Sequence, residues 1–154
     1  MPNVAGIESN TVLWVAIFAW CAASFLKMVV MFFKTRQLRF SLLVSSGGMP
    51  SAHSAFVAAM ATSVGVYEGF DSPIFALAAV VSIIVMYDAS GVRRAAGRQA
   101  KVINRMTEKM VENFKEFADT FDKRLKEVLG HSPLEVLAGC LLGVGMALAE
   151  GYIL

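Results

Sequence analysis

The stretch TVLWVAIFAWCAASFLKMVVMFF, Thr11–Phe33, is an apolar run in which Lys27 is the only charged residue. At about 1.5 Å per residue, a helix of this length crosses a hydrocarbon core of about 30 Å. The whole chain agrees with this stretch: 56% of its 154 residues are hydrophobic, 17% are charged and the mean hydropathy is +0.60. This apolar share exceeds that of an ordinary soluble domain. We therefore expect a single domain that is integral to a membrane.

Three more apolar segments complete the predicted bundle, at about residues 51–67, 73–87 and 133–154. The last segment begins with Pro133, which suits the first turn of a helix. It also carries Gly139 and Gly143, whose four-residue spacing suits close contact between helices.

An amphipathic helix is predicted over about residues 98–128, between the third and fourth apolar segments. Apolar residues recur there every three or four positions: Ile103, Met106, Met110, Phe114, Phe117, Phe121, Leu125 and Val128. Such a stripe can rest on the membrane surface, on the protein's own core or on a partner helix in a homodimer. The predicted fold class is all-α: an integral membrane helical bundle with about four transmembrane helices plus one amphipathic cytoplasmic helix.

The charges divide by side if all four segments span the membrane. Every basic residue except Lys27 falls in the first or third connecting segment, which lie on one side of the bundle. The charged residues on the other side are all acidic: Glu8, Glu68, Asp71 and Glu150. By the positive-inside rule, the basic side is cytoplasmic and both termini lie on the opposite side.

The predicted topology brings three polar blocks to the cytoplasmic side: GGMPSAHSA (47–55), YDASGVRRAAGRQAKVIN (87–104) and GHSPLEVLAG (130–139). The first and third blocks are junctions between a loop and a helix, where free backbone N–H groups and the helix dipole favour a bound anion. The arginines of the second block add bidentate recognition of phosphate. The residues alone therefore predict a phosphate pocket at the membrane surface.

Each block also has a purely structural interpretation. Ser51 can cap a helix, and Ser132–Glu135 fits a capping box in which Glu135 bonds the backbone. Arg93 and Arg94 can serve only as positive-inside anchors. The combination favours a site, because the chain's two histidines both lie in these blocks and Asp88 precedes the arginine pair.

The three blocks resemble the signature blocks of the divergent type 2 phosphatidic acid phosphatase family, small membrane proteins related to acid phosphatases and vanadium-dependent haloperoxidases. The resemblance extends from about Lys27 to Gly143. Pro50-Ser51-Ala52-His53 is similar to the PSGH motif of the wider superfamily, with alanine in place of glycine. His131 and Glu135 are similar to its H-x3-D motif, with glutamate in place of aspartate.

The first superfamily motif, K-x6-RP, has a looser counterpart. Lys27 and Arg36 are similar to it, although their spacing is longer and Gln37 follows the arginine in place of proline. The superfamily's third motif also has an arginine six residues before the histidine; Leu125 stands there in this chain. Arg93 or Arg94 would then supply the remaining phosphate contact.

The resemblance implies a metal-independent phosphatase of the acid phosphatase type that needs no cofactor and hydrolyses a lipid or polyprenyl phosphate. His131 would form a phosphohistidine, Glu135 would hold its imidazole, and His53 would act as general acid and then general base. The substrate-binding set would be Lys27, Arg36, Ser51, Asp88, Arg93 and Arg94. The expected partners are membrane lipids, the lipid phosphate substrate and a second copy of the chain or a larger membrane assembly, with no nucleic acid.

Two other functions stay open on the sequence. One is a non-catalytic membrane subunit that keeps the pocket to bind an anion or a lipid headgroup, as the altered first motif suggests. The other is a vanadate-dependent haloperoxidase, for which a lipid-embedded site is an unusual location.

Overall fold

The computed structural model describes residues 6–36, 48–113, 125 and 130–153, and all structural statements refer to these residues. They form five α-helices: α1 Thr11–Thr35, α2 Ala52–Glu68, α3 Pro73–Ser90, α4 Val92–Asn113 and α5 Pro133–Ile153. Polar side chains immediately before the first turn fix three of the starts. Asn10, Ser51 and Ser72 each accept a hydrogen bond from a backbone N–H of the turn that follows.

Helix α2 lies at the centre of the bundle and contacts α1, α3 and α5. Its interface with α1 and α5 is built almost wholly from small side chains: Val15, Ala19, Ala23, Ala52, Ala55, Ala59 and Ala147. Gly139 and Gly143 of α5 lie directly on the α2 backbone, where an added Cβ would overlap the carbonyl oxygens of Ser51 and Ala55. The close helix contact expected from the two glycines is therefore present.

Helix α3 packs on another face of α2. The Ser82 hydroxyl donates a 2.8 Å hydrogen bond to the carbonyl of Val57. Ala61, Val64 and Ala78 form a second small core there. The bundle thus has two thin layers of apolar contact, one on each side of α2.

Three helical stretches among the described residues are long and apolar enough to cross a membrane: Thr11–Phe33, the α3–α4 stretch Pro73–Met110, and Pro133–Ile153. The remaining predicted span, at about residues 51–67, corresponds to α2, which has 17 residues and is therefore about 25 Å long. Large apolar side chains point outward from the bundle, among them Phe18, Phe25, Leu77, Ile83 and Leu141. This outward apolar surface is what lipid contact requires, and the protein is an integral membrane helical bundle.

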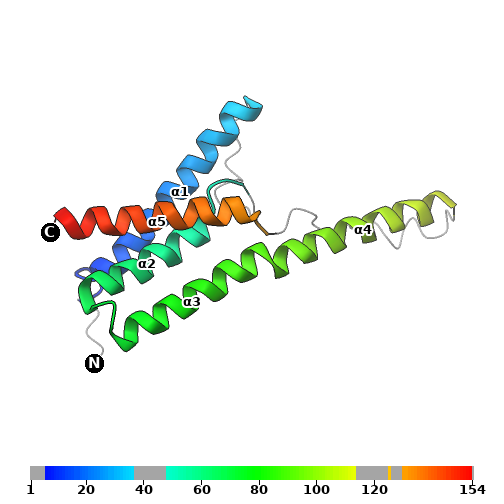
Figure 1. The fold of residues 1–154 in the computed structure, drawn as a ribbon. Coiled ribbons are helices and arrows are strands. Elements are labelled where there is room, and N and C mark those ends of the chain that lie inside the picture. Colours follow the sequence, from blue (N-terminus) through cyan, green and yellow to red (C-terminus); the bar gives the residue numbers. More distant parts are fainter. Residues whose placement is uncertain (1–5, 37–47, 114–124, 126–129, 154) are drawn as a thin grey trace.

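Helix α4 corrects the predicted amphipathic helix. It begins at Val92, six residues before the expected start, and extends away from the bundle nearly in line with α3 (Figure 1). The amide of Asn104 makes two hydrogen bonds to the backbone of Leu125, each 2.9 Å long. In one continuous helix, residues 21 apart would lie about 31 Å from each other. A single helix over 98–128 is therefore wrong, because the chain has returned to α4 by Leu125.

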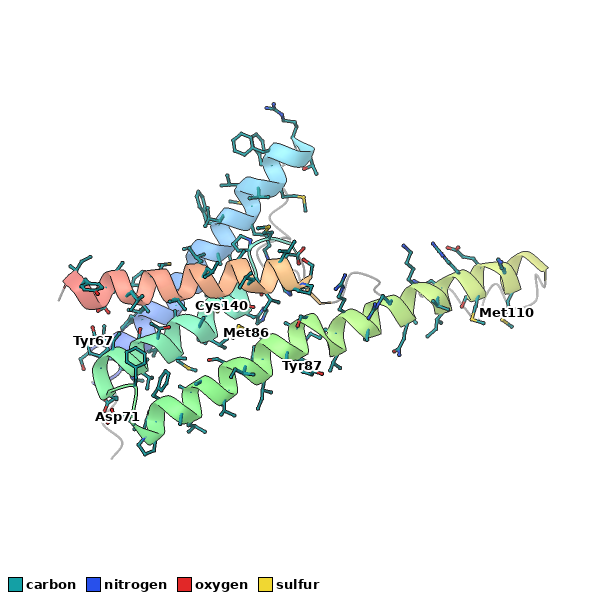
Figure 2. All side chains as sticks on the ribbon, viewed as in Figure 1. Tyr67, Asp71, Met86, Tyr87, Met110 and Cys140 are labelled. Carbon is teal, nitrogen blue, oxygen red and sulfur yellow. The ribbon has the colours of Figure 1, made fainter. Side chains whose placement is uncertain are left out.

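Residues 114–124 and 126–128 of the predicted helix lie outside the described residues. On α4 itself, the described apolar residues Val102, Ile103, Met106 and Met110 are exposed. Figure 2 shows Met110 far from the bundle.

The tight α2–α5 contact predicts a difference between two glycines of α5. Gly143→Ala places a Cβ against the Ala55 carbonyl and the Ala59 N–H, so we expect a loss of about 1–3 kcal/mol from overpacking. Gly145→Ala is the matched control, because no atom lies within 4 Å of its added Cβ. It should be neutral or stabilising by about 0.5–1 kcal/mol. Unfolding of the two variants in detergent measures this difference, and equal stability would refute the close approach.

Candidate phosphate site

The three polar blocks meet at one end of the bundle, where α2 and α5 begin and where α3 ends (Figure 1). Helix α1 begins and α5 ends at the other end. There the Tyr67 hydroxyl donates a 2.7 Å hydrogen bond to Oε1 of Glu150. Figure 2 shows Tyr67 and Asp71 at that end and Tyr87 toward the end that holds the polar blocks.

The first block is fastened to α5. The backbone N–H of Ser51 donates a 2.9 Å hydrogen bond to the carbonyl of Glu135, in the first turn of α5. The Ser51 hydroxyl is fully buried and caps α2, accepting hydrogen bonds from the backbone N–H and the hydroxyl of Ser54 at 3.3 and 2.9 Å. His53 follows in the first turn of α2, and its side chain is exposed.

The third block is fastened to the end of α3. The backbone N–H of His131 donates a 2.9 Å hydrogen bond to the carbonyl of Ala89. The side chain of His131 is buried, with 5% of its surface exposed. Its imidazole is therefore held inside the protein, beside the point where α3 gives way to α4.

Lys27 contributes a charge from within α1. Only 3% of its surface is exposed, and its aliphatic stem lies beside Gly48 at the start of the first block. A buried ammonium in an apolar span is costly and marks a functional position by default. The predicted link between Lys27 and the first block is therefore seen in the packing.

Charges from four helices act on the imidazole of His131. Burial lowers the pKa of His131 below its usual value, and this is the largest effect. The carboxylate of Glu135 opposes it by raising the pKa, whereas the positive charges of Lys27, His53 and Arg93 lower it further. These groups come from α1, α2, α4 and α5, so the fold brings together five of the predicted site residues.

Asp88 and Ser51 are linked to this group by hydrogen bonds to its members: Asp88 binds Arg93, and the backbone N–H of Ser51 binds the carbonyl of Glu135. Asp88 accepts a 2.6 Å hydrogen bond from Nε of Arg93 across the α3–α4 junction. Arg36 and Arg94 are exposed, and neither is among the described charges that act on His131. Arg36 ends α1 in a left-handed conformation, with φ 54°. The predicted contacts of Arg36 and Arg94 with phosphate stay predictions.

Comparison with known sequences gives the family. The sequence model of the divergent PAP2 family matches residues 8–146. The chain belongs to the divergent PAP2 family. It is also 43% identical over 137 residues to "Uncharacterized membrane protein YuiD" of Bacillus subtilis (strain 168), covering 84% of this chain and 87% of that protein. No solved structure matches.

In this divergent PAP2 protein, Glu135 completes a capping box. Its Oε2 accepts a 3.1 Å hydrogen bond from the backbone N–H of Ser132, and its own N–H reaches the Ser132 hydroxyl at 3.4 Å. The interpretation of Ser132–Glu135 as a capping box is therefore confirmed. Its carboxylate nevertheless acts electrostatically on His131, and its predicted role in orienting the imidazole stays a prediction.

Two backbone features of this PAP2 site were not predicted. The carbonyl of Ala89 fixes His131, and a carbonyl leaves no trace in sequence. Gly130 has φ +82°, a conformation that favours glycine. Its place directly before His131 was a usable signal. Within the described residues, no three His, Cys, Asp or Glu side chains are placed to hold a metal ion.

The charges around His131 predict how its titration responds to substitution. The imidazole should titrate below its usual pKa of 6.5, because burial opposes its charged form. Glu135→Gln removes the charge that, among the described residues, raises this pKa, and it keeps a side chain suited to the capping box, so the pKa should fall further. Nuclear magnetic resonance of histidine-labelled protein in micelles reports the titration, with His53→Asn assigning the two imidazoles. A His131 pKa that is unchanged by Glu135→Gln would contradict this geometry.

Proposed function

We propose that this protein is a metal-independent membrane phosphatase that hydrolyses a lipid or polyprenyl phosphate through a phosphohistidine at His131. The observation that carries the proposal is the convergence on one buried imidazole of Lys27, His53, Arg93 and Glu135, from four helices. A phosphate ester needs a nucleophile, a proton donor and positive charge on its oxygens. This constellation contains all three.

The first half of the proposed reaction transfers the phosphoryl group to His131. A lowered pKa keeps the buried imidazole neutral near pH 7, so that a ring nitrogen has a lone pair available for attack on phosphorus. As the P–N bond forms, the P–O bond to the lipid alcohol breaks. His53, whose charged form the negative charge of the bound phosphate favours, donates a proton to the departing oxygen. Lys27 and Arg93 stabilise the charge on the phosphoryl oxygens.

The second half releases phosphate. His53, now neutral, accepts a proton from a water molecule whose oxygen attacks the phosphorus. The P–N bond breaks, inorganic phosphate leaves and both histidines return to their starting protonation states. His53 is exposed and so has access to water, which this step requires.

A lipid substrate suits the position of this cluster. The site lies at an end of an apolar bundle, so a phosphate headgroup at the membrane boundary reaches it while the hydrocarbon tail remains in the bilayer. The excess of basic residues in the connecting segments favours the cytoplasmic side for this end. A homodimer is not required for this chemistry, because all five groups belong to one chain.

A binding function is the second candidate, and specific observations favour it. Glu135 is engaged in a capping box, and Arg36 lies outside the charges that act on His131. Ala52 stands where the superfamily motif has glycine. A protein with these features could retain a headgroup pocket without turnover.

Phosphate release tests the proposal. Purified protein in lipid nanodiscs should release inorganic phosphate from at least one of phosphatidate, phosphatidylglycerophosphate and a polyprenyl diphosphate. His131→Ala should lower that rate by a factor of about 1,000 or more, because the nucleophile is lost. Gly145→Ala, whose added Cβ meets open space, should retain the full rate.

Two outcomes would overturn the phosphatase. One is a folded wild-type protein that releases no phosphate from any member of the panel. The other is a folded His131→Ala variant with wild-type turnover. If the inactive protein still binds phosphatidate vesicles and His131→Ala weakens that binding, the headgroup-binding function replaces the phosphatase.

A further inference from the structure

The junction between α3 and α4 lies between the two groups that the proposed reaction must align. Helix α3 ends at Ser90, Gly91 has φ −102° and ψ −84°, and α4 begins at Val92. At this break the carbonyl of Ala89 accepts the hydrogen bond from the backbone N–H of His131. In an uninterrupted helix a carbonyl accepts a hydrogen bond from the N–H four residues further on. The break therefore coincides with a carbonyl that binds another part of the chain.

Gly130 makes the approach of the third block possible. Its φ of +82° lies in the region that residues with a side chain rarely adopt. An added Cβ would lie 2.5 Å from the backbone nitrogen of Arg94 and 2.9 Å from both the Ala89 carbonyl oxygen and the carbonyl carbon of Arg93. Gly130 is thus seated directly on the backbone of the junction, and no larger residue fits there without movement.

Asp88 acts on the other side of the same junction. It binds Nε of Arg93 at 2.6 Å, joining the last turn of α3 to the first turn of α4. Because Asp88 binds Nε, the outer edge of the guanidinium is left for phosphate oxygens. The ion pair also fixes the direction in which that edge points. Arg93 in turn is one of the charges that act on His131.

We propose that the α3–α4 junction sets the register between nucleophile and phosphate-binding arginine, with Gly130 as the positioning residue for His131 and Asp88 as the positioning residue for Arg93. This inference rests on the proposed phosphatase. Residues 88–94 are the common reference: the Ala89 carbonyl holds the backbone of His131, and the Asp88 carboxylate holds Arg93. Neither positioning residue touches the reacting atoms.

The two positions predict different kinetic effects. Gly130→Ala displaces the nucleophile from the junction and retains the Asp88–Arg93 ion pair, so its main effect should be a lower kcat. A displacement of about 1 Å can cost about 100-fold in rate. Asp88→Asn releases Arg93, which binds phosphate in both the ground state and the transition state, so it should raise KM. Asp88→Glu keeps a carboxylate for Arg93 and should restore a near-normal KM.

The experiment compares full-length variants in nanodiscs, with p-nitrophenyl phosphate as the probe and Gly145→Ala as the matched control. We expect Gly130→Ala to lower kcat by about 30- to 100-fold with KM within about twofold, and Gly145→Ala to match the wild type. A folded Gly130→Ala variant with wild-type kcat would overturn the positioning role. If Gly130→Ala does not fold, the Asp88 pair decides: a KM raised at least about fivefold in Asp88→Asn and restored in Asp88→Glu supports the register. Equal kinetics of the two Asp88 variants would overturn it.

An inactive wild type would overturn the phosphatase, and the register would still be testable. The imidazole resonances of His131 report its surroundings without turnover. A shift of its titration in Gly130→Ala, absent in Gly145→Ala, supports the seating of His131 on the junction. Identical titrations in the two variants would overturn that seating.

Discussion

The close approach of α5 to α2 is the constraint on which the rest of the structure depends. Glycines at 139 and 143 bring the two backbones together, so that the N–H of Ser51 reaches the carbonyl of Glu135. Small residues at a membrane helix interface permit such contact because association there depends on packing and hydrogen bonds. Once α2 and α5 begin at the same level, His53 and His131 must lie at one end of the bundle.

The charges at that end are unusual for their surroundings. Lys27 and His131 are both buried within a bundle whose outer surface is apolar. Isolated, each positive charge would be strongly destabilised, and a lowered pKa of His131 is the expected response. An anion that binds beside Lys27 would be attracted by its positive charge.

Much of the fold could be predicted from the sequence, because each apolar segment carries its own signals. Pro133 marks the start of α5, and the helices found at the four segments end within about one turn of the predicted limits. The helix over 98–128 could not be bounded in this way. Helical periodicity continues past Asn113, and only the tertiary hydrogen bonds between Asn104 and Leu125 show that the chain reverses.

The side chains of the site could be predicted from the sequence, whereas its backbone contacts could not. His53, Arg93, His131 and Glu135 were recognised as candidates from the motif blocks, and Lys27 from its resemblance to the first superfamily motif. The structure places the other four within electrostatic reach of His131. Sequence could not separate Arg93 from Arg94, since only the helix that begins at Val92 fixes which of the two charges acts on the imidazole. The contact of the Ala89 carbonyl with His131 could not be predicted either, because every residue has a backbone carbonyl and no side-chain pattern marks this one.

The central claim is that His131 carries the phosphoryl group, and trapping that intermediate tests it most directly. Protein quenched in alkali during turnover of a radiolabelled lipid phosphate should retain label on a histidine, and mass spectrometry should locate it at His131. The label should be lost in acid, in which phosphohistidine is unstable, and should be absent from His131→Ala. Turnover without any phosphoprotein, or label on another residue in the wild type, would contradict the account.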